Sequence, residues 1–357
     1  MVTPRKRVSL ALSHKQPDRV PIGYSATPEV NNNLKKYLNI NSDSELLKRL
    51  GVDYRMVFPD YVGPKDLLSE KDWSDLPGKD IWGVERRTVK NVYGEYREIC
   101  KHPLKDVKDI EELERYPWPK TEWFDFASLE KQFEVLDEED EYWVILSGAS
   151  SFEQAWYLRG MEQFLMDLIV NPDIAYKIME KIYEFSISRI IESIKATKDR
   201  IDMIWFCDDV ASQSGMFMSV DTWRKMIKPW AKKYYKISHD YSKKTLYHCC
   251  GSLEPIIEDL IEVDLDALNP IQFSAKGFPE PEVLKERYGS RLCFEGGMDV
   301  QTVLPFCSAE DVKKETKKLI RILGKDGGYI LQPSHNIQPD TPIENIMAMY
   351  DTALNYF

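Results

Sequence analysis

The sequence predicts a (β/α)8 barrel, in which eight parallel strands form a closed ring with helices around the outside. Eight short apolar runs, many with β-branched or aromatic residues, recur along the chain, as expected for buried parallel strands. Helical patterns separate most of these runs, and this alternation is typical of a parallel sheet. The length of 357 residues suits one barrel with insertions, so we expect residues 1–357 to form a single domain.

Strands and helices are expected to alternate along the chain. The predicted strands are residues 20–24, 54–58, 143–146, 203–207, 245–249, 267–269, 292–294 and 328–331. The predicted helices are residues 41–50, 160–169, 174–197, 219–242, 255–262, 280–288, 309–323 and 343–355. Among the helix starts, Ser219 is a typical N-cap residue, and Asp221 places a negative charge in the first turn, where the helix dipole favours it.

One region breaks this alternation. Residues 65–141 are rich in charged and aromatic side chains. Within them, residues 82–84 and 91–96 resemble a β-hairpin, and the Tyr-Pro-Trp-Pro run at 116–119 resembles a rigid connector. We therefore expect an insertion after the second strand that covers the mouth of the barrel.

The composition excludes several classes of partner. The net charge of −11 argues against nucleic acid, because phosphate binding needs a basic surface. No apolar run reaches the roughly 18 residues of a membrane span, and no long apolar stretch follows the basic N-terminus as it would in a signal peptide. The six cysteines show no disulfide-framework spacing. We expect a cytoplasmic protein with reduced thiols.

Polar residues follow most of the predicted strands, and in a parallel barrel such residues meet at one end. They include Asp60, Asp208, Asp209, Asn269, Gln272, Glu295 and His335. The Asp208–Asp209 pair is suited to holding a cation, binding a substrate amine or transferring protons, and the alternative is that one carboxylate caps the next helix. Tyr157 follows the third strand at a greater distance and is a candidate wall for a flat ligand, with plain packing as its alternative.

His248 and Cys250 form the most specific internal motif. At strand spacing, residues i and i+2 point to the same face, so an imidazole nitrogen and a thiolate can approach one ion. Zinc accepts such ligands and needs about four in total. His335 is the first choice for a third ligand, with Glu295 or Asp208 next. The alternative is a buried thiol beside a hydrogen-bonded histidine. The other strand-associated cysteines, Cys207, Cys249 and Cys293, are expected in the core.

Several motifs together resemble the uroporphyrinogen decarboxylase superfamily over nearly the whole chain. They are the Ser-His-Asn-Ile-Gln-Pro-Asp-Thr-Pro run at 334–342, the His-Cys-Cys-Gly run at 248–251, the Leu-Asn-Pro-Ile-Gln run at 268–272, the Phe-Glu-Gly-Gly-Met-Asp run at 294–299, and Asp208-Asp209 with Gln213. The resemblance implies a (β/α)8 barrel with its active site at the carboxyl ends of the strands.

The resemblance leaves two enzymatic branches open. Decarboxylases of the superfamily bind the carboxylates of a tetrapyrrole through arginines near the N-terminus, but the matching residues 22–29 contain none. Asp60 and His335 nevertheless match positions that line the decarboxylase site. The zinc-dependent methyltransferases use a His-x-Cys motif and a later cysteine. His248 and Cys250 match that motif, whereas His335 lies where the later cysteine is expected.

These observations favour a methyltransferase that moves a methyl group between a small methylated substrate and the corrinoid of a partner protein. Its expected metal ligands are His248, Cys250 and His335, holding zinc. Asp208, Asp209, Asp60 and His335 are the candidate catalytic residues, and Tyr157, Gln213, Asn269, Gln272 and Glu295 are the candidate substrate contacts. The alternatives are a cofactor-independent decarboxylase and a non-catalytic partner of a corrinoid protein. Related barrels often pair, so a homodimer is also expected.

Overall fold

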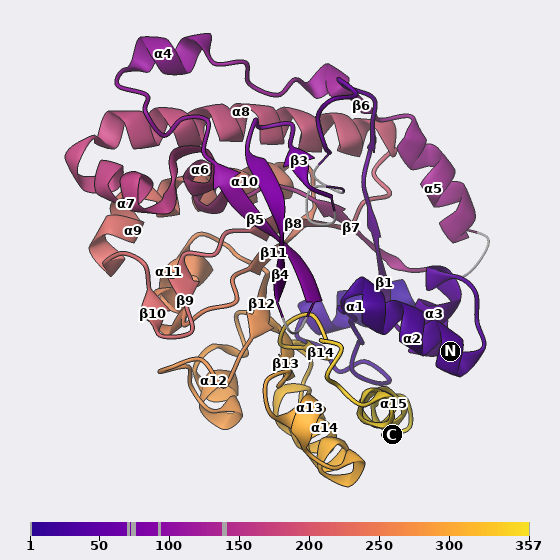
Figure 1. Cartoon of the computed structure of the whole chain (residues 1–357). Helices are drawn as coiled ribbons and strands as arrows, with labels where there is room; N and C mark the ends of the chain where they lie inside the picture. The colour runs from indigo at the N-terminus through magenta and orange to yellow at the C-terminus, as the bar shows by residue number, and fades with distance from the viewer. Residues whose placement is uncertain (1, 70–71, 73–75, 92–93, 138–140, 357) are drawn as a thin grey trace.

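The centre of the molecule is a curled, wholly parallel sheet (Figure 1). The computed structural model describes residues 2–69, 72, 76–91, 94–137 and 141–356. The strands, in their order across the sheet, are β1 (Tyr54–Val57), β7 (Trp143–Ser147), β8 (Met203–Cys207), β11 (Lys244–His248), β12 (Ala267–Ile271), β13 (Cys293–Met298) and β14 (Tyr329–Pro333). Each corresponds to a predicted strand, with ends that differ by a few residues.

The first predicted strand, residues 20–24, is reduced to a short bridge between the two edges of this sheet. The backbone N–H of Gly23 donates to the carbonyl of Leu331 in β14 at 2.8 Å, and the N–H of Leu331 donates to the carbonyl of Pro21 at 2.9 Å. On the other side, the N–H of Asp53 donates to the carbonyl of Ile22 at 2.9 Å. Pro21 has no N–H, so a longer regular ladder cannot form here. The seven strands and this segment together are consistent with a (β/α)8 barrel.

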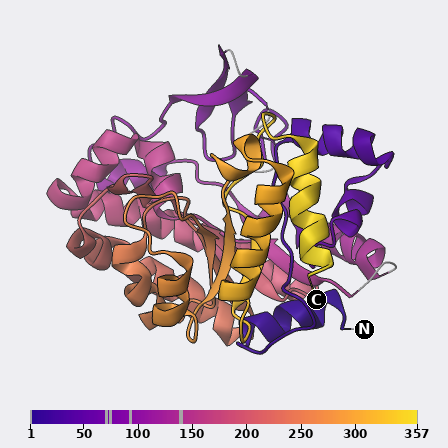
Figure 2. The same ribbon diagram turned by 90° about the horizontal axis from the view of Figure 1, so that it is seen from below.

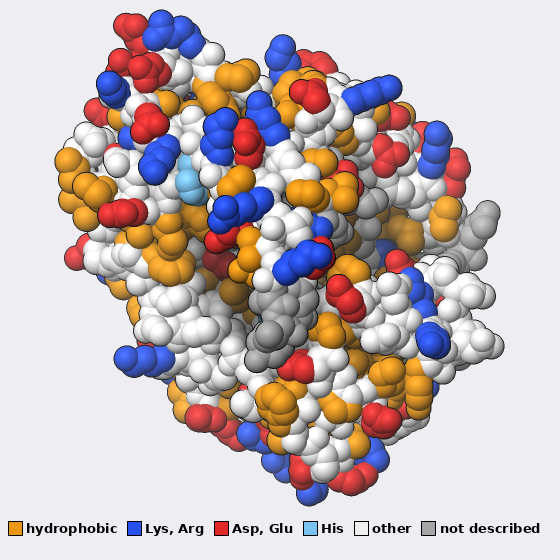
Figure 3. All heavy atoms as spheres, viewed as in Figure 1, with side chains coloured by type: hydrophobic (Ala, Val, Ile, Leu, Met, Phe, Trp, Pro, Cys, Tyr) orange, Lys and Arg blue, Asp and Glu red, His pale blue; other side chains and the backbone are white. Residues whose placement is uncertain are grey.

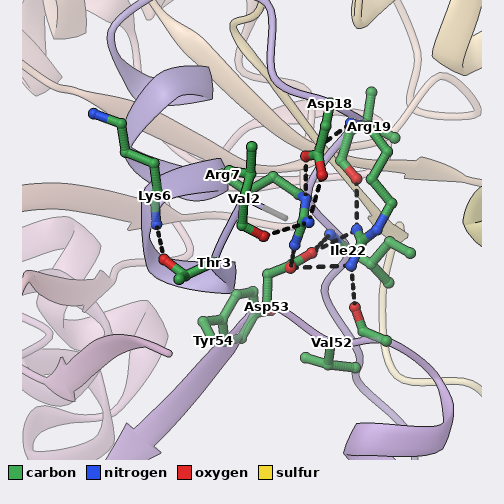
Figure 4. Close-up of polar contacts among 12 residues, drawn as sticks. Val2, Thr3, Lys6, Arg7, Asp18, Arg19, Ile22, Val52, Asp53 and Tyr54 are labelled. Atoms are coloured by element: carbon green, nitrogen blue, oxygen red, sulfur yellow. Dashed lines mark hydrogen bonds and ion pairs between the residues drawn. The ribbon is translucent and has the colours of Figure 1, made fainter. Parts of the chain in front are cut away.

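A buried ionic network fixes the bridge segment (Figure 4). The fully buried carboxylate of Asp53 accepts hydrogen bonds from Arg7 at 2.6 Å and from Arg19 at 2.7 Å. It also accepts the backbone N–H of Ile22 at 2.7 Å. Asp18 binds the other edge of the Arg7 guanidinium. One carboxylate therefore ties the first helix, the bridge segment and the start of β1 together.

Helices surround the sheet (Figures 1 and 2). They are α1 (Pro4–Leu12), α2 (Pro28–Leu38), α3 (Asp43–Arg49), α4 (Ile110–Arg115), α5 (Ser128–Asp137), α6 (Phe152–Arg159), α7 (Met161–Val170), α8 (Pro172–Ala196), α9 (Val220–Met226), α10 (Lys228–Asp240), α11 (Ile257–Glu262), α12 (Pro281–Tyr288), α13 (Val303–Phe306), α14 (Ala309–Leu323) and α15 (Ile343–Leu354). The predicted helix 219–242 is wrong in one respect, because it is divided at Ile227. Pro229, in the first turn of α10, lacks the N–H that would continue the preceding helix.

The apolar core has two parts. The larger part fills the space between the sheet and the surrounding helices. The smaller part lies inside the curled sheet, where strand residues such as Met203, Leu246 and Ile330 meet Val8 and Leu12 of α1. Helix α1 thus closes the amino end of the strands, and any site reached from solvent must lie at their carboxyl end.

The segment between β1 and β7 forms small antiparallel sheets. Strands β3 (Gly78–Lys79), β4 (Glu85–Asn91) and β5 (Gly94–Lys101) form one, and β2 (Asp60–Tyr61) pairs with β6 (Phe124–Asp125). The β4–β5 hairpin stands out in front of the sheet in Figure 1 and projects from one end of the molecule in Figure 2. The hairpin prediction was shifted, because residues 82–84 precede its first strand, and residues 92–93 lie outside the described residues. That this segment is an insertion stays a prediction.

Two surface properties bear on possible partners. Among the described residues, no helix is both long and apolar enough to cross a membrane. Figure 3 shows acidic and basic side chains interspersed on the viewed face, without one continuous basic field.

Candidate active site

Three side chains that follow the strand ends converge. The candidate ligand atoms of His248, Cys250 and His335 all lie within 4.8 Å of one another. His248 is the last residue of β11, Cys250 lies two residues later, and His335 lies two residues beyond β14. The set combines two imidazoles with a thiol, which is a donor set that zinc accepts. The structure thus brings together the three residues that the sequence analysis grouped as metal ligands.

The imidazole of His248 is oriented by Asn269. Its Nδ1 lies 2.5 Å from the Oδ1 of Asn269, which can only accept, so Nδ1 carries the proton. The other ring nitrogen, Nε2, is then left with a free lone pair. Metal-binding histidines are commonly held in this way by a hydrogen bond to the opposite ring nitrogen. Asn269, predicted as a substrate contact, therefore also positions His248.

Asp209 holds Cys250. The Oδ1 of Asp209 accepts the backbone N–H of Cys250 at 2.9 Å, and its Oδ2 accepts the thiol at 3.2 Å. Burial, followed by the nearby negative charge of Asp209, raises the pKa of Cys250 to about 12. A thiol in this setting stays protonated until a cation displaces the proton, as zinc does when it binds cysteine.

His335 completes the group from the carboxyl end of β14, the last strand in the sheet order. Its ring centroid lies 6.4 Å from that of His248. Burial, and next the positive charge of a protonated His248, lower the pKa of His335, which favours the neutral imidazole that metals bind. Tetrahedral zinc, with bonds of about 2.1 Å to nitrogen and 2.3 Å to sulfur, separates its ligand atoms by about 3.4–3.6 Å. The three ligand atoms lie within 4.8 Å of one another, so a bound zinc would draw them closer together.

A cavity of about 360 Å³, here called the inner cavity, lies beside this group. Its lining includes His248, His335, Trp205, Asn269 and Glu295. Among the described residues that line it, there is no lysine or arginine. Its volume is at the lower end of the range for small-molecule sites.

The floor of the inner cavity is a hydrogen-bonded triad of Tyr54, Gln332 and Glu295. The Tyr54 hydroxyl lies 2.5 Å from the Oε1 of Gln332 and 2.8 Å from the Oε1 of Glu295. The phenol has one proton for these two contacts, so the second contact needs either a proton on the Glu295 carboxyl or a turned Gln332 amide that donates its NH2 to the phenol. Burial raises the pKa of Glu295 to about 7, against the opposing effect of hydrogen bonds from Tyr54 and Asn269. Gly23 lies directly under the triad, since an added Cβ there would come within 2.3 Å of the Gln332 oxygen.

Glu153 and Tyr157 line a neighbouring cavity of about 340 Å³, here called the side cavity. The Tyr157 hydroxyl donates to Glu153, and the thiol of Cys207 donates to the other oxygen of the same carboxyl at 3.2 Å. Burial, and next the charge of Asp209, raise the pKa of Glu153. The expectation that Cys207 is a core residue was wrong, because its thiol lines this cavity, whereas Cys249 and Cys293 are buried in the core. Trp205 borders both the inner and the side cavity.

Asp208 has a structural hydrogen-bonding role. Its Oδ1 accepts the Ser150 hydroxyl at 3.0 Å and the backbone N–H of Glu153, in the first turn of α6, at 2.9 Å. This is the helix-capping alternative considered for the Asp208–Asp209 pair. Burial raises the pKa of Asp208 to about 7. A catalytic role for Asp208 stays a prediction.

The remaining predicted residues, Asp60, Gln213 and Gln272, are not among the residues that line the inner cavity. Asp60 lines a third cavity, of about 980 Å³, and does not line the inner one. The Gln213 amide donates to the carbonyl of Cys250 and to Gln272, at 2.8 Å in each case. Gln213 and Gln272 therefore brace the loop that carries Cys250, and direct contact with a substrate stays a prediction for both.

The sequence analysis missed Glu153, Tyr54 and Gln332. Glu153 precedes Tyr157 by four residues, which places both on one helix face, and this spacing was a usable signal. Tyr54 and Gln332 lie within strands. The sequence around them does not show whether a polar strand residue faces a cavity or packs in the core. Their meeting depends on strand neighbours that only the closed sheet defines.

Comparisons with known proteins agree with this architecture. The sequence model of the family described as Uroporphyrinogen decarboxylase (URO-D) matches residues 88–356. A uroporphyrinogen decarboxylase from Coxiella burnetii is 20% identical over 332 residues, covering 87% of this chain and 79% of that protein. The methylcobamide:CoM methyltransferase MtaA from Methanosarcina barkeri is 28% identical over 160 residues, covering 44% of this chain and 42% of that protein.

A solved methyltransferase structure from Methanosarcina mazei covers 100% of this chain and 99% of its own, with a TM-score of 0.68 and 19% sequence identity. At this identity, the likeness establishes a shared fold. The family match extends over most of the sequence, including every strand of the parallel sheet from β7 to β14. The chain therefore belongs to the uroporphyrinogen decarboxylase family.

Proposed function

We propose that this protein is a methyltransferase that moves a methyl group between a small methylated substrate and the corrinoid of a partner protein. The observation that carries the proposal is the convergence of His248, Cys250 and His335 beside the inner cavity. A set of two imidazoles and a thiol suits zinc and leaves a fourth position for a substrate atom. The partial similarity to a methylcobamide:CoM methyltransferase supports the same branch of the family.

In this proposal, His248, Cys250 and His335 would hold zinc, which would supply Lewis-acid chemistry at the atom that gains or loses the methyl group. Asn269 keeps the Nε2 lone pair of His248 available, and Asp209 orients the thiol of Cys250. Glu295 contacts the substrate from the cavity floor.

The other predicted residues have proposed roles farther from the metal ligands. Tyr157 and Glu153 contact a substrate group in the side cavity, and Asp60 anchors one in the third cavity. Gln213 and Gln272 keep the Cys250 loop in place.

The partners follow from this chemistry. The open carboxyl end of the barrel receives the corrinoid protein, and a homodimer remains part of the proposal. All six cysteines are free. A reducing compartment such as the cytoplasm would keep Cys250 available as a thiolate ligand. The segment at 65–141 is proposed as an insertion in a single-domain (β/α)8 barrel, near the docking end.

Metal analysis of purified variants tests the proposal. We expect the wild-type protein to bind about one zinc per chain and the double variant His248→Ala, Cys250→Ser to bind none. Cys307→Ser is the matched control, because Cys307 is exposed and does not belong to the group. Transfer of a methyl group to a cob(I)alamin-loaded corrinoid protein should disappear together with the zinc. Full activity without bound metal would contradict the zinc-assisted mechanism.

A decarboxylase is the second candidate, favoured by the similarity to the Coxiella burnetii enzyme over 87% of the chain. The lack of lysine and arginine in the lining of the inner cavity weighs against a polyanionic substrate there. Incubation with uroporphyrinogen, followed by chromatography of the products, decides between the two. Products with fewer carboxyl groups would favour the decarboxylase. Tight capture of a corrinoid protein with no turnover of any substrate would favour a non-catalytic partner.

A further inference from the structure

Glu153 lines the side cavity, and two neutral hydrogen-bond donors hold its carboxyl group in place. The Tyr157 hydroxyl donates to one carboxyl oxygen, and the Cys207 thiol donates to the other at 3.2 Å. All three residues line the side cavity. Each carboxyl oxygen has two lone pairs, so the group can accept these bonds and still carry a proton. Neutral partners fix the position of the carboxyl without supplying the positive charge that would keep it ionised.

The side cavity adjoins the metal-ligand group. Cys207, the last residue of β8, is the register partner of His248, the last residue of β11. Neighbouring strands lie about 4.8 Å apart, so Glu153 binds the direct strand neighbour of a proposed metal ligand. The ring of Trp205, which borders both cavities, lies 5.6 Å from the ring of His248. A substrate held at the metal-ligand group therefore lies close to the side cavity.

The surroundings of Glu153 favour its protonated form. Burial, and next the negative charge of Asp209, raise the pKa of Glu153 against the opposing effects of its two hydrogen-bond donors and of His248. The charge of Glu153 in turn helps to raise the pKa of Cys250, in keeping with a carboxyl near the metal-ligand group. A protonated carboxyl beside a substrate cavity is suited to general acid catalysis.

Methyl transfer requires a proton when the methyl group leaves a neutral oxygen or sulfur atom. The methyl group departs without its bonding electron pair, so an ether leaves an alkoxide and a thioether leaves a thiolate. Each of these anions becomes a neutral alcohol or thiol by gaining one proton. A methyl group on a positively charged nitrogen or sulfur atom instead leaves a neutral amine or thioether, which needs no proton. A positioned proton donor therefore distinguishes between these substrate classes.

We propose that Glu153 gives a proton to the oxygen or sulfur atom that loses the methyl group, and that the substrate is a neutral methyl ether or methyl thioether. This inference rests on the proposed methyl transfer and names its substrate class. The bond between the methyl carbon and oxygen or sulfur breaks together with the O–H bond of Glu153. A cobalt–carbon bond and a new O–H or S–H bond form. The cobalt(I) of the corrinoid supplies both electrons of the cobalt–carbon bond, so cobalt is formally oxidised to cobalt(III) while the methyl group is formally reduced. The Glu153 carboxylate then regains a proton from solvent.

The first test compares two methyl donors of similar shape on the zinc-loaded, full-length protein, with cob(I)alamin as the acceptor. Dimethyl sulfide leaves methanethiolate, which needs a proton, whereas the trimethylsulfonium ion leaves neutral dimethyl sulfide. The visible absorbance of the cobalamin follows the transfer, and the rate without protein is subtracted. Glu153→Gln should lower kcat/KM about a hundredfold or more for dimethyl sulfide and less than about threefold for trimethylsulfonium. Equal losses with both donors would overturn the inference, because a structural role affects every donor alike.

Two controls accompany this variant. Glu162→Gln makes the same change at the second residue of α7, the position that Glu153 occupies in α6, but on the exposed surface. It should leave kcat/KM for both donors within about twofold of wild type. Zinc content is the readout that does not depend on activity. Glu153→Gln should keep the zinc of wild type, and loss of the metal would mean that Glu153 is a ligand, which would overturn its assignment as the proton donor.

The second test needs no mutation and separates this inference from the proposed function. Wild-type protein is offered dimethyl sulfide, methoxybenzene and trimethylsulfonium, and formation of methylcobalamin is measured. We expect transfer from at least one of the two neutral donors. Transfer from trimethylsulfonium alone would mean that the substrate class is wrong and that the methyltransferase stands. If none of the three donors yields methylcobalamin, the proposed methyl transfer fails, and the inference fails with it.

Discussion

Replacing Asp53 with Asn should destabilise the protein strongly. The carboxylate is completely buried and accepts four hydrogen bonds, from Arg7, from Arg19 twice and from the backbone N–H of Ile22. Asn keeps nearly the same shape but loses the negative charge, and its NH2 group faces donors where an acceptor is needed.

The size of the effect follows from the burial of the partners. The side chains of Arg7 and Arg19 are 8% and 15% exposed, so water cannot replace the lost charge. Removing one partner of a buried ion pair costs about 3–5 kcal/mol, and a buried N–H left unpaired costs about 1–3 kcal/mol. Asn retains one acceptor oxygen, and Asp18 still compensates Arg7, so we expect a total loss of about 3–5 kcal/mol.

Equilibrium unfolding in urea measures this loss. The matched control is Asp351→Asn, because Asp351 also pairs with an arginine, Arg49, but its side chain is 47% exposed. The control should change the unfolding free energy by less than about 1 kcal/mol. If Asp53→Asn lowers the free energy of unfolding by less than about 1 kcal/mol, the reasoning is refuted, because the network would then contribute no more than a surface ion pair.

Three further predictions concern the site. The pKa of Glu295 is raised from 4.5 in the unfolded state to about 7 in the folded state. Between these values the folded state holds a proton that the unfolded state releases. The protonated carboxyl therefore adds about 3 kcal/mol to the free energy of unfolding at low pH, and this contribution is lost as the pH rises through 7. Between about pH 5 and about pH 8, the free energy of unfolding should thus fall more for wild type than for Glu295→Gln. Parallel pH profiles of the two proteins would contradict the raised pKa. Gly23→Ala should cost about 1–3 kcal/mol in unfolding free energy, since the new methyl group displaces Gln332, and an unchanged value in urea unfolding would contradict this close contact. Asp208→Ala should cost about 1–2 kcal/mol in unfolding free energy by removing the cap on α6, and an unchanged value would argue against capping.

Much of the fold could be predicted because the strands are short apolar runs that differ from their surroundings. β8 and α14 have the predicted bounds, and the other main strands differ only at their ends. The two wrong predictions, one for a strand and one for a helix, can each be traced to a proline. Residues 20–24 look like a strand, but Pro21 limits their hydrogen bonding to a bridge. Pro229 divides a helix whose apolar pattern is continuous.

Site residues that come directly after a strand could be predicted from the sequence. Site contacts that depend on which strands lie side by side could not. His248, Cys250 and His335 could be grouped because each comes just after a strand, and their ligand atoms lie within 4.8 Å of one another. Asp60 also follows a strand, but it begins the short strand β2, which pairs with β6, and it lines a different cavity. The hydrogen bond between Tyr54 and Glu295 could not be foreseen, since it joins strands that are distant in sequence.

The bridge between Ile22 and Leu331 has a consequence for how the protein is made. The ring of backbone hydrogen bonds is completed by an early segment and by the final strand of the sheet. On the ribosome, the final strand emerges last, so the ring stays open through most of synthesis. Open sheet edges invite pairing with other chains, and long-range closure is slow. Newly made chains should therefore be most prone to aggregate, and most dependent on chaperones, just before β14 is released.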